Sequence, residues 1–167
     1  MNRLRDILLA LTLVAPFAMP ESGLSAGDFP QIVESVRQVL AQRKFESDDG
    51  FTMAFGVLRR GTNYAGAEID VVMTTADGSR HGFIERYFNG SSQVTMDQIF
   101  SRNARSTFLA TFEAPYRVLR IRPLDSNNPD LISRECFFDA RINRNVCYFK
   151  IRQDGSVYFR TFKEVKF

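Results

Sequence analysis

The chain has 167 residues and a formal net charge of +3, with 16 phenylalanines and no tryptophan. This length suits a single domain that can bury a core without help from metals or several crosslinks. The basic residues gather in the C-terminal part, which indicates either an anionic partner or arginine-rich strands that are simply well solvated. The lack of tryptophan slightly disfavours a site that stacks sugar rings.

The first 25 residues are predicted to be a cleavable secretory signal. Arg3 and Arg5 precede an apolar run from Ile7 to Met19, and a positive start followed by such a run is typical of a signal peptide. The run is shorter than the roughly 20 residues of a membrane-spanning helix. We therefore predict a signal peptide over residues 1–25 and one domain over 26–167, periplasmic or secreted, with no transmembrane segment after removal of the signal.

A helix is predicted at the start of this domain, followed by three strands. Asp28 can cap an amphipathic helix whose apolar stripe extends to Leu40. Residues 51–57 and 68–74 alternate between large apolar and smaller or polar side chains, as half-buried strands do. Residues 80–88 fit either a hairpin strand or a helix, and we predict a strand.

A second helix is predicted over residues 95–112. Thr95 and Gln98 match a capping box, and Phe108 and Phe112 continue an apolar stripe at helical spacing. The remaining segments are β-rich: residues 116–122, 132–142, 146–152 and 157–163. The predicted fold is α+β, an antiparallel sheet with two amphipathic helices packed on it, in the order α-β-β-β-α-β-β-β-β.

Two pairing registers compete in the last hairpin. A two-residue Asp154-Gly155 turn would place Phe149 opposite Arg160, whereas a three-residue loop shifts the pairing by one residue. Because burial selects the register, we predict the second. Its inner face carries Cys147, Phe149, Ile151, Val157 and Phe159. Its outer face carries Tyr148, Lys150, Arg152, Tyr158 and Arg160.

This basic and aromatic outer face is the predicted binding surface. Arginine can stack on tyrosine and still present its donors to a carboxylate or phosphate. The expected partner is another protein or an anionic component of the cell envelope. The alternative is that cross-strand Arg–Tyr pairs only stabilise the sheet.

Cys136 and Cys147 are the two cysteines of the chain, and in an oxidising compartment such a pair is expected to form a disulfide. A catalytic thiol would need a nearby histidine, and the one histidine, His81, is distant in sequence. A lone histidine also provides no second nitrogen ligand for zinc, so no metal site is predicted. Glycine patterns that bind nucleotides are absent from the sequence, and we expect no cofactor.

We predict a small exported protein that binds a partner without catalysis, as an accessory, inhibitor or immunity-type factor. One alternative is an exported hydrolase in which His81 acts as general base and Glu85 orients it. A second alternative is a structural component of an envelope assembly.

Overall fold

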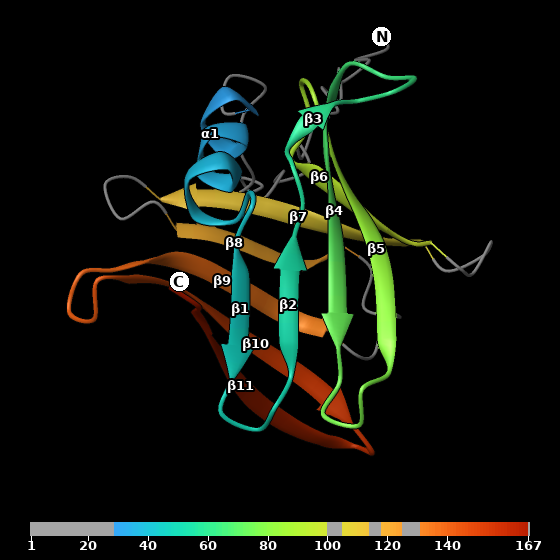
Figure 1. Cartoon of the computed structure of the whole chain (residues 1–167). Coiled ribbons are helices and arrows are strands. Elements are labelled where there is room, and N and C mark those ends of the chain that lie inside the picture. Colours follow the sequence, from blue (N-terminus) through green and yellow to red (C-terminus); the bar gives the residue numbers. More distant parts are fainter. Residues whose placement is uncertain (1–28, 100–104, 114–117, 125–130, 167) are drawn as a thin grey trace, which may run out of the picture.

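The computed structural model describes residues 29–99, 105–113, 118–124 and 131–166, which form one helix and eleven strands (Figure 1). The predicted signal and Asp28, the predicted cap of the first helix, lie outside these residues. Helix α1 spans Phe29–Val39. The strands are β1 (Lys44–Ser47), β2 (Thr52–Phe55), β3 (Arg59–Arg60), β4 (Gly66–Thr74), β5 (Arg80–Phe88), β6 (Gln93–Gln98), β7 (Arg105–Glu113), β8 (Val118–Pro123), β9 (Leu131–Asp139), β10 (Arg144–Gln153) and β11 (Ser156–Glu164).

The strands form a closed antiparallel barrel, not the predicted open sheet with helices on it. From β4 to β11, consecutive strands pair as neighbours. The barrel closes because β1 pairs with β11 and β2 pairs with both β1 and β4, which makes a ring of ten strands, while β3 pairs with β4 outside it. The α+β prediction with two amphipathic helices is therefore wrong.

The predicted helix over residues 95–112 is two strands, β6 and β7. Residues 100–104 lie outside the described structure. Phe108 and Phe112 are four residues apart, and a spacing of four fits one face of a helix but also one face of a strand. The β-branched and aromatic side chains of β7 and pairing with strands on both sides favour the extended form. The first helix and the strand over residues 80–88 are confirmed.

The β10–β11 hairpin adopts the register that we rejected. Gln153 pairs with Ser156, and Phe149 lies opposite Arg160. Asp154 and Gly155 both have positive φ, 50° and 77°, as a two-residue hairpin turn of the primed type requires. Burial does not oppose this register, because residues 154–159 are all exposed where the hairpin extends beyond the barrel wall.

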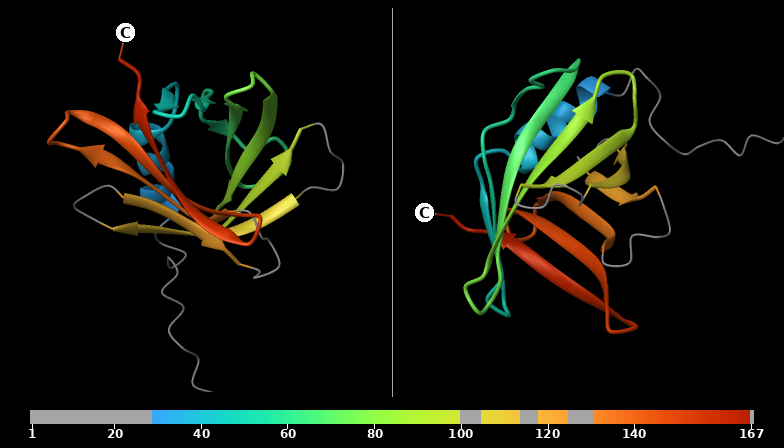
Figure 2. Two further views of the ribbon diagram at one scale, coloured as in Figure 1. Left: turned by 90° about the horizontal axis from the view of Figure 1, so that it is seen from below. Right: turned by 90° about the vertical axis from the view of Figure 1, so that its right-hand side faces the viewer.

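Helix α1 closes one end of the barrel. Its apolar side, which includes Ile32, Val36 and Val39, is buried in the main core together with side chains from the inner faces of the strands. Figures 1 and 2 show α1 and the β10–β11 turn at opposite ends of the molecule. The predicted disulfide between Cys136 and Cys147 is confirmed, and it joins β9 to β10 within the core.

Candidate functional site

The open end of the barrel leads into a lumen of about 920 Å³. Its walls come from the inner faces of seven strands, β2, β4, β5, β6, β7, β9 and β10, together with the β10–β11 turn. Most of the wall is apolar, with three methionines among its side chains: Met53, Met73, Met96, Val71, Phe83, Phe108, Leu131, Phe149 and Ile151. A concave apolar space of this size is in the range of small-molecule binding sites.

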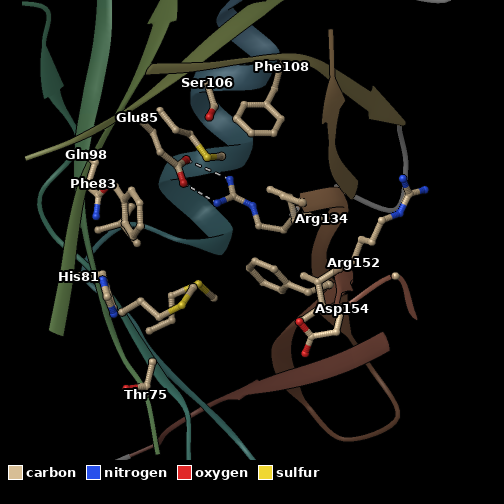
Figure 3. A pocket seen from close by; sticks show the side chains of 18 residues that line it. Thr75, His81, Phe83, Glu85, Gln98, Ser106, Phe108, Arg134, Arg152 and Asp154 are labelled. Atoms are coloured by element: carbon tan, nitrogen blue, oxygen red, sulfur yellow. Dashed lines mark hydrogen bonds and ion pairs between the residues drawn. The ribbon is translucent and has the colours of Figure 1, made fainter. Parts of the chain in front are cut away.

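The floor of the lumen holds a buried ion pair (Figure 3). Glu85 of β5 and Arg134 of β9 are each 2% exposed. The guanidinium grips the carboxylate with two hydrogen bonds, of which Nη2 to Oε2 is 2.9 Å, and the Tyr87 hydroxyl donates a third to Oε2 at 2.7 Å. Every carboxylate oxygen of Glu85 thus has a donor, as a buried charge requires.

Arg134 also carries a nitrogen that has no partner in this ion pair. Its Nε is buried and has no hydrogen-bond partner among the described residues. Burial by itself would lower the pKa of the Arg134 guanidinium, but the Glu85 carboxylate raises it above its ordinary value, so the side chain stays charged. Burial and the charge of Glu85 raise the pKa of Tyr87 well above its ordinary value, so its hydroxyl keeps its proton.

The mouth of the lumen is polar. Thr75 and His81 lie on the β4–β5 side, and Arg152 and Asp154 lie on the β10–β11 side (Figure 3). The site is therefore graded along its depth, with a polar rim, an apolar wall and a charge-balanced polar floor.

The two residues of the hydrolase alternative both reach the lumen, but at different depths. His81 and Glu85 are in phase on the inner face of β5, four residues apart, which corresponds to about 13 Å along a strand. His81 lies at the mouth, whereas Glu85 lies on the floor and is held by Arg134 and Tyr87. The structure thus does not bring them together as a base and its orienting group.

The five residues of the predicted outer face are divided between the two faces of the hairpin. The observed register puts Tyr148 and Lys150 on the outer face, in phase with Val157 and Phe159. Arg152 is in phase with them but, next to the turn, also borders the mouth of the lumen. Tyr158 and Arg160 are on the other face, in phase with Phe149. Arg160 there stacks on Phe51 at 3.7 Å and donates to Asp49 at 2.9 Å.

Sequence reasoning missed Arg134, although a signal for it was present. Cys136 was expected to be buried in a disulfide, and the residue two positions before it shares its strand face. Arg134 therefore had to point inward if Cys136 did. In the same way Glu85 is in phase with Phe83 and Tyr87.

Three further observations concern the location of the protein and the capacity of this site to hold a metal. The disulfide and the described fold are compatible with an extracellular location. Among the described residues, no helix has both the length and the apolar character that crossing a bilayer requires. The described part of the chain also contains no cluster of three acidic, histidine or cysteine side chains placed to hold a metal ion.

The fold and the site together define a closed antiparallel barrel that is plugged at one end and hollow at the other. No protein-family model, curated protein or solved structure matches the chain.

Proposed function

We propose that this domain is an exported, non-enzymatic binding protein that holds a small amphiphilic ligand in the lumen of its barrel. The observation that carries the proposal is the lumen of about 920 Å³, which is mostly apolar along its wall and polar at its floor. Apolar wall side chains can desolvate a tail, and the flexible side chains of Met53, Met73 and Met96 can adapt to its shape.

The floor favours an uncharged polar group at the inner end of the ligand. The charges of Arg134 and Glu85 balance one another there. A carboxylate would add an unbalanced negative charge next to Glu85, and a buried charge without a partner is costly. A carbonyl or ester oxygen instead adds no charge to the balanced pair of Glu85 and Arg134.

Export and the absence of catalysis are parts of the same proposal. The apolar run after Arg3 and Arg5 supports passage across a membrane, and the disulfide supports an oxidising destination such as a periplasm. The engagement of both Glu85 oxygens by Arg134 and Tyr87 supports a structural and ligand-positioning role for this carboxylate.

The test uses the absence of tryptophan from the chain. A Met96→Trp variant places a single fluorophore in the lumen wall, and a Phe138→Trp variant places one on a side chain that is 43% exposed and does not line the lumen. Each variant is titrated, below micelle formation, with methyl dodecanoate, dodecanoate and dodecyltrimethylammonium. Far-ultraviolet circular dichroism checks that both variants keep the fold.

We expect methyl dodecanoate to shift the Met96→Trp emission saturably to shorter wavelength and to leave Phe138→Trp unchanged. Dodecanoate, with the same tail, should bind at least about tenfold more weakly, because each 1.4 kcal/mol of unpaired-charge cost is a factor of ten. An unchanged emission of Met96→Trp, or equal emission changes in Met96→Trp and Phe138→Trp, would contradict binding in the lumen. Tighter binding of dodecanoate would contradict the proposed polarity of the ligand.

A further inference from the structure

The β10–β11 hairpin ends in an apolar tip that extends from the barrel wall. Three consecutive residues of β11 are exposed, Val157 by 44%, Tyr158 by 50% and Phe159 by 78%. Within a strand, neighbouring side chains point to opposite faces, so both faces of the hairpin are uncovered at this point. A protein rarely leaves such a run exposed unless another apolar phase covers it.

Two cations lie next to the exposed side chains on one face of this tip. The Lys150 ammonium lies 5.7 Å from the centre of the Phe159 ring, and Arg152 lies directly opposite Val157. Neither Lys150 nor Arg152 forms an ion pair with another described residue, whereas Arg160 on the other face is paired with Asp49. The one acid of the tip is Asp154, at the turn.

We propose that this tip, residues 150–159, docks on a bilayer that contains anionic lipids. Aromatic side chains favour the headgroup level of a membrane, and long basic side chains can bury their stems there while their charges meet lipid phosphates. A second copy of the chain fits less well, because it would bring the same two unpaired cations to the contact.

Docking of the tip would place the bilayer beside the mouth of the lumen. Arg152, Asp154 and Gly155 line the mouth of the lumen, so a bilayer that receives the tip lies beside the mouth. Helix α1 closes the opposite end of the barrel (Figure 2). Docking itself does not depend on the lumen being occupied, and it can be measured without a lumen ligand.

The experiment places a single tryptophan at the tip as Phe159→Trp and, as a matched exposed aromatic near α1, at Phe138→Trp. Both are expressed from the full coding sequence, and mass spectrometry verifies that their amino termini are identical. Vesicles contain either phosphatidylcholine alone or phosphatidylcholine mixed with phosphatidylglycerol, and brominated lipids serve as quenchers. The expected result is a blue shift and quenching for Phe159→Trp with the anionic vesicles, and neither for Phe138→Trp.

A second experiment measures how partitioning into the vesicles depends on the charges of Lys150 and Arg152. Each basic residue near an anionic surface strengthens binding about fivefold, so Lys150→Gln with Arg152→Gln in the Phe159→Trp protein should weaken partitioning about 30-fold. Arg144→Gln, at the other end of β10, should change it less than twofold. Quenching that is absent at the tip, equal at both reporters, or insensitive to the Lys150 and Arg152 changes overturns the proposal. A blue-shifted Phe159→Trp dimer in size-exclusion chromatography without lipid overturns it in favour of self-association.

Discussion

Replacing Arg134 with methionine should strongly destabilise the barrel. The change removes both guanidinium hydrogen bonds to Glu85 and leaves that carboxylate, 2% exposed, with the Tyr87 hydroxyl as its remaining partner. Breaking a buried pair in this way costs about 3–5 kcal/mol. Because domains of this size are stable by about 5–15 kcal/mol, Arg134→Met should lose about a fifth of the total or more.

Urea unfolding, followed by far-ultraviolet circular dichroism with the disulfide intact, measures this loss. Adding Glu85→Gln removes the orphaned charge and keeps an acceptor for Tyr87, so the double variant should recover at least half of it. Arg105→Met is the matched control, because Arg105 grips Asp97 with two bonds of 2.8 and 3.0 Å but is 66% exposed. We expect this control to lose less than about 1 kcal/mol. Equal losses for Arg105→Met and Arg134→Met, or a double variant that loses the sum of both single effects, would refute the reasoning.

Three further predictions concern stability. Reducing the disulfide between Cys136 and Cys147, whose positions are 11 residues apart, should cost about 3 kcal/mol in the chain-entropy account, seen as a lower urea midpoint in dithiothreitol. Hydrogen bonds, first that from the Thr75 hydroxyl, lower the pKa of Asp77 to about 2 from an ordinary 3.8. The stability advantage of the wild type over Asp77→Asn should therefore be complete above the ordinary pKa and disappear as the pH falls through about 2, in acid titrations of both proteins. Gly155→Ala puts a side chain at φ +77° and should cost about 1–2 kcal/mol by urea unfolding, whereas an unchanged midpoint would contradict the observed turn.

The strands were predictable where one face is buried and the other is not. In β4, Ile69, Val71 and Met73 share one face, as the pattern predicted. The pattern of β5 was ambiguous, and the turn before it, which carries a glycine with positive φ, favoured the strand. The part of β11 next to the turn has no buried face. Because Val157 and Phe159 are exposed, their apolar character predicted an inner face that they do not occupy.

Closure of the barrel depends on strand pairings that cannot be recognised from the sequence of the strands themselves. Strand β1 has four residues and begins at Lys44, shortly after α1 ends at Val39. Its pairing with β11 is not indicated by its own short sequence. Strand β2 was predicted from its alternation, but its sequence does not indicate that it contacts β4 on one side and β1 on the other. A sheet with these edges unpaired remains open, and an open sheet has no lumen.

The lumen follows from the number of strands and the length of the helix. An eight-stranded barrel is just filled by its own side chains, whereas a ring of ten encloses more space than the inward side chains can occupy. Helix α1 fills this excess only at its own end. The boundary falls between successive inner positions of β5, because Glu85 lines the lumen and Tyr87 does not, and the disulfide of the core lies on the helix side of the same boundary. The ion pair of Glu85 and Arg134 is therefore the innermost layer of the lumen. Under the proposed function, the polarity of this layer, rather than that of the mouth, should decide which ligand the barrel retains.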